Sequence, residues 1–309
     1  MDLSSPPSSR WSDPLVGRFW RLAASGWLPA RWVQPPLPPP GERAARTGRL
    51  HLEIVSHCWQ YAHLQRYQLS SLVRFPPRDI EVTMTVYHSR QDEDTVRLLQ
   101  EFGQRAVPGV SWNWRDLPPP SLFRRAIGRN EAARRTEADW IWFTDCDLLF
   151  RADCLDALGA ALQGSRESLV YPRTEYVTPL LSDEHPMLSP EAGAGAVVDI
   201  DPSLFHASSR GRATGPLQIT HGDIARAAGY CEAIRYYQRP APAWTKAYED
   251  RAFRWLLERV QRASAAREWA LHRQWPRDPL AHGSPAGRRM APRTPQGTVM
   301  PRGIGASST

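Results

Sequence analysis

The stretch WIWFTDCDLLF, residues 140–150, places two aspartates inside an apolar run. Its first four residues are aromatic or β-branched and the run is short, so it predicts a buried strand at 140–143. Side chains alternate along an extended backbone, so Asp145 and Asp147 should point to one side, about 6 Å apart. Two such carboxylates repel each other unless a cation lies between them, and a divalent cation bound through oxygen is the natural partner.

The neighbouring segments alternate between strand and helix patterns. Runs rich in apolar and β-branched residues predict strands at 50–58, 80–88, 110–114 and 168–178. Apolar residues at helical spacing predict helices at 63–75, 93–103, 121–136 and 154–164. This alternation predicts a three-layer α/β/α, Rossmann-like domain with a mostly parallel central sheet. In such sheets ligands bind beyond the carboxyl ends of the strands, where Asp145 and Asp147 are expected.

The two ends of the chain differ in composition from the middle. The 309 residues are 41% hydrophobic, enough for a sizeable core, but about half of the 29 prolines precede His51 or follow Trp275. Proline-rich and glycine-rich segments bury too little surface to offset chain entropy. We therefore expect a flexible N-terminal arm at 1–47, a globular domain at 48–275 and a disordered basic tail at 276–309.

Charge and cysteine usage restrict the partners and the compartment. The net charge of +7 favours anionic partners such as nucleotides, phosphates or anionic lipid, unless the basic residues only keep flexible ends soluble. Four cysteines without a CxxC pair suit a reducing cytoplasm. No zinc motif and no aromatic-basic RNA-binding pattern is present, so we expect no nucleic-acid partner.

One segment of the arm has two interpretations. Residues 13–32 interleave large apolar side chains with Arg18, Arg21 and Arg31, and no run of 18 apolar residues occurs anywhere in the chain. A helix with an aromatic face and basic flanks is typical of peripheral contact with a membrane surface, here the inner face. The alternative is that the segment packs on the protein's own domain.

Several further motifs follow one another at a characteristic spacing. A basic helix carries RN and then small residues at 128–133, and the strand with Asp145-Cys146-Asp147 comes next. A short helix closing on Gly229-Tyr230-Cys231-Glu232 lies at 224–232, and the pair Glu249-Asp250 opens an amphipathic segment. His272 follows about twenty residues later. This order resembles the GT-A glycosyltransferases, specifically family 2, over about residues 50–275.

The resemblance implies a metal-dependent hexosyltransferase, which moves a sugar from a nucleotide-sugar. Asp147 would bind Mn or Mg directly, Asp145 would contact the metal through water or the ribose, and His272 would complete the coordination. Asp250 would deprotonate the acceptor hydroxyl in an inverting reaction, with Glu249 binding acceptor hydroxyls. Acidic residues also favour the first turn of any helix, which is the structural alternative for this pair.

The resemblance is weaker where the donor and the acceptor would bind. The family's nucleobase loop corresponds to Ser56 and His57, which depart from its usual sequence, and Tyr87 stands near its usual uracil-binding aspartate. Arg129 and Asn130 would bind ribose or diphosphate. UDP-sugar is the expected donor.

The expected acceptor is a glycan or lipid-linked hydroxyl, as in polysaccharide biosynthesis. Trp244 and His221 are the candidate acceptor-binding residues, and His221 is also a rival metal ligand or a helix cap.

Two other functions compete with this interpretation. The D-x-D also resembles haloacid-dehalogenase-type phosphatases, but Leu149 stands where that motif has Thr or Val, and no downstream Asp-Asp pair follows. The second is a non-catalytic protein that binds nucleotides or anionic polymers on the same fold. The irregular nucleobase segment at Ser56 and His57 keeps this alternative open.

Overall fold

The structure is a computed structural model that describes residues 13–179, 181, 185–189, 196–244, 247–257 and 270–273. The chain divides into two compact units, Met1–Trp275 and Pro276–Thr309, and every described residue belongs to the first. The predicted basic tail at 276–309 therefore lies outside the described residues, as do the first twelve residues of the predicted arm.

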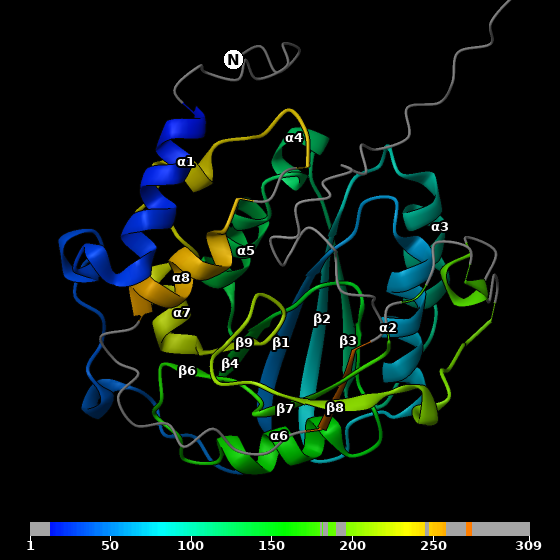
Figure 1. Ribbon diagram of the computed structural model, residues 1–309. Coiled ribbons are helices and arrows are strands. Elements are labelled where there is room, and N and C mark those ends of the chain that lie inside the picture. Colours follow the sequence, from blue (N-terminus) through cyan, green and yellow to red (C-terminus); the bar gives the residue numbers. More distant parts are fainter. Residues whose placement is uncertain are drawn as a thin grey trace, which may run out of the picture. The chain divides into compact units, whose positions relative to one another are not determined.

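A six-stranded sheet forms the centre of the described part of the domain. Its order is β3 (Val110–Asp116), β2 (Ile80–His88), β1 (Leu50–His57), β4 (Trp140–Phe143), β9 (Gln218–His221) and β6 (Leu169–Val170). β1 pairs in parallel with β2 and β4, and β2 with β3, whereas β9 runs antiparallel to β4 and β6. This mixed, mostly parallel sheet confirms the predicted fold class (Figure 1).

β4 shows how the sheet separates two cores. Trp140 and Trp142 face one core, while Ile141 and Phe143 face the other, because successive side chains point to opposite faces. Each of the four is at most 2% exposed. Burial of a large apolar side chain contributes about 1.5–3 kcal/mol, so this strand strongly fixes its own register.

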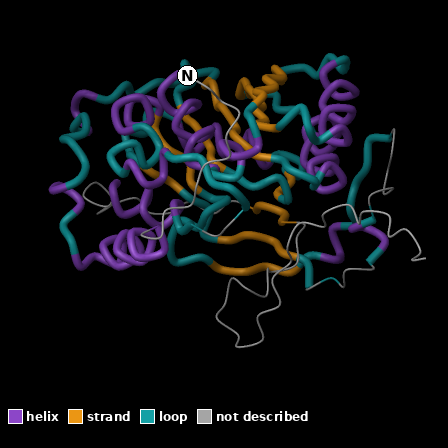
Figure 2. The backbone as a smooth tube through the Cα atoms, turned by 90° about the horizontal axis from the view of Figure 1, so that it is seen from above, coloured by secondary structure: helices purple, strands orange, loops and turns teal. Residues whose placement is uncertain are grey.

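Helices cover both faces of the sheet and complete the three layers (Figures 1 and 2). The Trp142 side is covered by α2 (Ala62–Arg74), α3 (Glu93–Gly103) and α6 (Cys154–Leu162). The Phe143 side is covered by α5 (Arg125–Arg135), α7 (Gly222–Ala228) and α8 (Glu249–Leu257).

A smaller sheet begins directly after the D-x-D. Its order is β5 (Leu148–Leu149), β10 (Ala270–Arg273), β7 (Thr174–Val177) and β8 (His206–Ser209). β10 pairs antiparallel with β5, with His272 opposite Leu149. The backbone of β10 is therefore next to the chain that leaves Asp147.

Two predicted elements are divided in the structure. The helix expected at 121–136 consists of α4 (Pro119–Leu122) and α5, separated at Phe123 and Arg124. The strand expected at 168–178 consists of β6 and β7, which belong to different sheets. Pro172 lies between them and has no N–H to donate to a sheet ladder.

The segment before β1 packs against α8. Residues 13–32 form α1 (Asp13–Leu22) and two short helices, η1 (Ala23–Trp27) and η2 (Ala30–Trp32). Ala23 and Ala24 are buried in the same core as α8, and Trp255 Nε1 donates a 2.9 Å hydrogen bond to the Leu28 carbonyl. This arrangement matches the alternative in which the segment packs on its own domain. None of the helices in the described ranges is long and apolar enough to cross a membrane.

Candidate active site

The loop that carries Asp145 and Asp147 leaves β4 at the carboxyl end of the sheet. Thr144 N donates to the Val55 carbonyl at 2.9 Å, which continues the pairing of β4 with β1 by one residue. Gln68 on α2 donates through Nε2 to the carbonyls of Asp145, at 2.9 Å, and Leu148, at 2.8 Å. The buried amide of Gln68 therefore holds the backbone on both sides of Asp147.

Two arginines of α5 bind the carboxylate of Asp145. Arg125 Nη1 lies 2.7 Å from Asp145 Oδ1, and Arg129 Nη2 lies 3.1 Å from the same oxygen. The two arginines are four residues apart, so they share one face of the helix. Arg129 is completely buried and also donates to the Thr144 carbonyl at 3.0 Å. Charge-assisted hydrogen bonds of this kind fix Asp145 in one position.

Arg125 also brings the start of α8 to this loop. Its Nε lies 3.7 Å from Oε1 of Glu249, whose side chain is buried. Burial raises the pKa of Glu249, while Arg125, Arg129 and Arg124 oppose that rise. Thus one guanidinium lies between carboxylates that belong to the two motifs identified in the sequence.

A chain of hydrogen bonds connects Arg129 to Asp250. Arg129 Nη1 donates to the Tyr230 hydroxyl at 2.9 Å, and that hydroxyl donates to Gln218 Oε1 at 3.2 Å. Gln218 Nε2 donates to the backbone carbonyl of Asp250 at 2.8 Å. Burial raises the pKa of Tyr230, so it stays a neutral donor. Tyr230 of the Gly-Tyr motif thus connects the arginine that binds Asp145 to the backbone of Asp250.

His57 and Tyr87 form a buried aromatic pair at the ends of β1 and β2. Their rings stack with centroids 5.0 Å apart. Neither ring nitrogen of His57 has a hydrogen-bond partner among the described residues. Burial, together with Arg129 and Arg125, lowers the pKa of His57 well below its ordinary value. Asp145, Arg125, Arg129 and Glu249 form what we call the Asp145 cluster. A neutral imidazole whose nitrogens have no partner among the described residues is therefore held beside this cluster.

The other expected donor contacts are engaged within the protein. Ser56 is buried and its Oγ donates to Gln65 Oε1 at 3.0 Å. Asn130 Oδ1 accepts from the Tyr230 backbone N–H at 2.8 Å and so fixes the turn after α7. Both residues position the site, and Asn130 does so through Tyr230.

Trp244 is at the rim of the cluster. Its ring centroid lies 5.6 Å from the Arg125 guanidinium, and its side chain is 40% exposed. Phe123 packs edge-on against it, with ring centroids 6.5 Å apart. An exposed indole beside the arginine offers a flat face to an incoming molecule.

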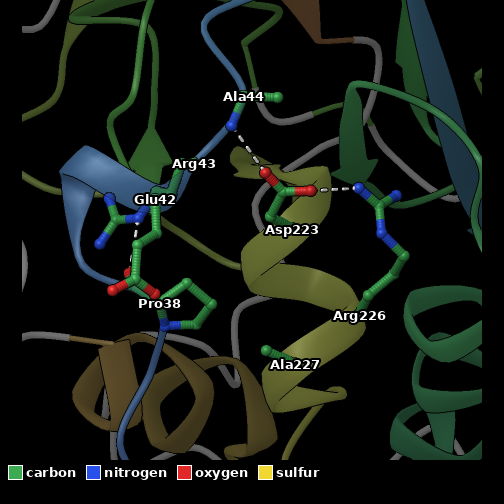
Figure 3. Close-up of a pocket in the computed structure, with 7 residues that line it drawn as sticks. All are labelled: Pro38, Glu42, Arg43, Ala44, Asp223, Arg226 and Ala227. Carbon is green, nitrogen blue, oxygen red and sulfur yellow. Dashed lines mark hydrogen bonds and ion pairs between the residues drawn. The ribbon is translucent and has the colours of Figure 1, made fainter.

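His221 lies at the opposite end of β4 from Asp145, because it pairs with Trp140 while Gln218 pairs with Phe143. Its Nδ1 accepts from the Asp223 N–H at the start of α7, so it is the helix cap. A surface pocket of about 590 Å³ lies at this same end, lined by Arg43, Asp223 and Arg226 among others (Figure 3). Neither His221 nor this pocket belongs to the Asp145 cluster.

Candidate ligands for the metal expected from the sequence lie on the loop after β4 and on β10. Asp145 and Asp147 supply the oxygen ligands that Mg and Mn prefer, and β10 carries His272 in the strand next to β5. Within the described ranges, no three His, Cys, Asp or Glu side chains form a group that could hold a metal ion. The described residues thus offer two carboxylates of suitable chemistry, Asp145 and Asp147, and no complete set of metal ligands.

Three residues of the site were not identified from the sequence: Gln68, Arg125 and Gln218. The spacing of Arg125 and Arg129 was a usable signal, since two arginines four residues apart on a helix face the same way. Gln68 sits among apolar residues of α2, a pattern that indicates a buried amide with a partner. Nothing in the local sequence of Gln218 indicated its contact with Asp250.

No protein-family model and no curated protein matches this chain. Among solved structures, the mannosyltransferase PcManGT from Pyrobaculum calidifontis, in complex with GDP-Man and Mn2+, is 15% identical, with a TM-score of 0.44. The alignment covers 86% of this chain and 70% of that one. TarS from S. aureus is 11% identical with a TM-score of 0.42, and the alignment covers 73% of this chain and 37% of TarS. The chain thus spans well under half of TarS, and at these identities and TM-scores the similarities assign no activity to it.

Proposed function

We propose that this chain is a glycosyltransferase that moves a sugar from a nucleotide-sugar to a hydroxyl acceptor. The observation that carries the proposal is the convergence of the two acidic motifs on Arg125. Its Nη1 lies 2.7 Å from Asp145 and its Nε lies 3.7 Å from Glu249. Two acidic motifs so far apart in sequence and joined by a partly buried arginine favour a shared site over two independent helix or turn caps.

The donor would bind at the carboxyl ends of β1, β2 and β4. The unused ring nitrogens of His57 are suited to a polar group of the nucleotide, and Arg129 and Arg125 give that region positive charge. Asp147, with Asp145, would hold a divalent cation, Mn or Mg, which when bound would neutralise charge on the departing diphosphate. Trp244 would offer an apolar face to a sugar ring at the rim.

Asp250 would act as general base in an inverting transfer. It would accept the proton of the acceptor hydroxyl while that oxygen forms a bond to the anomeric carbon. The bond from this carbon to the phosphate oxygen would break, and the nucleoside diphosphate would leave with the electron pair. Glu249 lies next to Asp250 and is oriented by Arg125, so it would help to position the acceptor hydroxyl.

The experiment is incubation of the chain with UDP-, GDP-, ADP- and dTDP-sugars in the presence of Mn or Mg. Release of nucleoside diphosphate from one donor, faster with an added glycan acceptor, would support the proposal. Saturable nucleotide binding without any release would instead establish a binding protein on this fold. The second outcome would remove Asp250 from any catalytic role.

A further inference from the structure

Large exposed apolar side chains concentrate on one segment of the chain. Of eight such side chains among the described residues, five lie between residues 15 and 32. These five, which we call the 15–32 surface, are Leu15 (57% exposed), Phe19 (45%), Leu22 (54%), Trp27 (66%) and Trp32 (68%). Single exposed apolar residues are ordinary, whereas five on one short segment are typical of an interaction site.

The helical period explains why α1 has two apolar faces. Leu15, Phe19 and Leu22 are spaced at i, i+4 and i+7, so they form one outward stripe. Trp20 and Ala23, on another side of the same helical segment, pack into the core that contains α8. The inner face therefore packs on the domain, and the outer stripe is left exposed to solvent.

The 15–32 surface is attached to α8 by specific contacts. Arg251 Nε donates to the Ala24 carbonyl at 3.3 Å, and Trp255 Nε1 donates to the Leu28 carbonyl at 2.9 Å. The Arg21 guanidinium lies 4.4 Å from the centre of the Tyr248 ring. A segment held in this way presents its side chains to a partner in a fixed arrangement.

Apart from Asp13 in the first turn of α1, the charges within this segment are positive. Residues 14–41 contain Arg18, Arg21 and Arg31 and no aspartate, glutamate or lysine. All three arginines are exposed. We propose that the 15–32 surface docks on an anionic lipid bilayer, with its leucine, phenylalanine and tryptophan side chains at the headgroup boundary and its arginines against lipid phosphates.

Charge complementarity favours this partner over a second copy of the chain. In a symmetric dimer built on the 15–32 surface, the same arginines of both copies would face one another. Such like charges disfavour association, whereas near an anionic membrane each arginine increases affinity by about fivefold. Tryptophan side chains also suit the interface between water and lipid, since one ring edge is polar. The inference does not depend on the transfer reaction proposed above.

The test uses the full chain and vesicles of phosphatidylcholine with or without phosphatidylglycerol, followed by flotation. We expect binding only to vesicles that contain phosphatidylglycerol, weakened by added salt because charges at a surface are screened. Trp27→Ser combined with Trp32→Ser should lower the affinity at least about tenfold. Leu204→Ser, an exposed apolar change outside the 15–32 surface, is the matched control and should bind like the native chain.

A pair of arginine substitutions tests the electrostatic contribution to membrane binding. Arg18→Glu combined with Arg31→Glu should abolish binding, whereas Arg97→Glu on α3 should have little effect, although Arg97 is also exposed to solvent. Far-UV circular dichroism of each variant checks that it is folded. Absence of binding by the native chain, or equal binding by the tryptophan variant, would overturn the proposal. Self-association that the tryptophan variant abolishes, without vesicle binding, would identify the surface as a contact between copies instead.

Discussion

Arg125 Nη1 lies 2.7 Å from Asp145 Oδ1, and this contact joins the first turn of α5 to the loop after β4. The same guanidinium reaches Glu249 through its Nε at 3.7 Å. A planar guanidinium can hold two carboxylates in different directions, which a lysine ammonium cannot reproduce. The relative positions of the two acidic motifs thus depend on one side chain.

Arg125→Lys should therefore impair turnover more than nucleotide binding. The positive charge remains, but the two carboxylates lose their shared support, and such misplacement costs about 100-fold in rate. Steady-state kinetics with the donor that the nucleotide-sugar panel selects would measure the effects on kcat and on KM separately. Arg135→Lys is the matched control, because Arg135 lies on the same helix and pairs with Glu131 at the surface. An unchanged kcat in Arg125→Lys would contradict the role assigned to Arg125.

Asp250→Asn should retain nucleotide binding and lose turnover. Loss of a general base costs a factor of about 100 to 10,000, while the Gln218 hydrogen bond to the Asp250 backbone carbonyl is preserved. Calorimetric titration with nucleoside diphosphate and Mn, alongside a nucleotide-release assay, separates the two effects. Native rates in this variant would exclude Asp250 as the base.

Glu249→Gln tests the electrostatics of the buried carboxylate. Because burial raises the pKa of Glu249 in the folded chain, its ionisation is harder there than in the unfolded chain. The stability it contributes is therefore present at low pH and is lost as pH rises through the folded pKa. The difference in Tm between Glu249→Gln and the native chain should therefore be more favourable to the variant at neutral pH than at acidic pH. A variant whose relative Tm does not depend on pH would contradict the raised pKa.

The strand of the D-x-D was predictable, whereas the support of the site was not. The short run of bulky aromatic and β-branched residues from Trp140 to Phe143 predicted the position of β4, because burial on both faces is a local property of the sequence. The contacts of Gln68 and Gln218 join elements far apart in sequence, so no local pattern specifies them. The proline-rich composition before β1 indicated a flexible arm, yet Ala24 is buried because α8 supplies a partner for it.

His57→Phe should stabilise the fold and weaken nucleotide binding. Phenylalanine preserves the stack on Tyr87 and removes two buried nitrogens that have no partner among the described residues. The pKa of His57 is lowered by burial and by Arg129 and Arg125, so the native chain loses stability as pH falls below about 6.5, where the unfolded chain takes up the proton.

The variant should therefore show a smaller loss of Tm between neutral and acidic pH. Its affinity for nucleoside diphosphate should fall about tenfold if one hydrogen bond to the imidazole is lost. His51→Phe, at the start of β1, is the control, since that half-buried histidine already contacts Thr83. An affinity equal to that of the native chain would remove His57 from the donor site.

Gly128→Ala tests whether α5 fixes the His57 ring. A Cβ at residue 128 would lie 2.4 Å from His57 Nε2 and 2.9 Å from Tyr87 Cγ, so the aromatic pair must move. Overpacking costs roughly 1–3 kcal/mol, against a gain in helix propensity of about 1 kcal/mol. Urea unfolding should show a net loss of stability, whereas Gly41→Ala, with nothing within 4 Å of the added Cβ, should change little.

The double variant Gly128→Ala with His57→Ala identifies the cause. Removal of the imidazole frees the space that the new Cβ needs, so the two changes should be less destabilising together than the sum of the single effects. The same cycle measured on nucleotide affinity should also show coupling, because Gly128→Ala should have no further effect once His57→Ala has removed the ring that Gly128 positions. Additive effects on stability would mean that His57 does not pack against α5 as described.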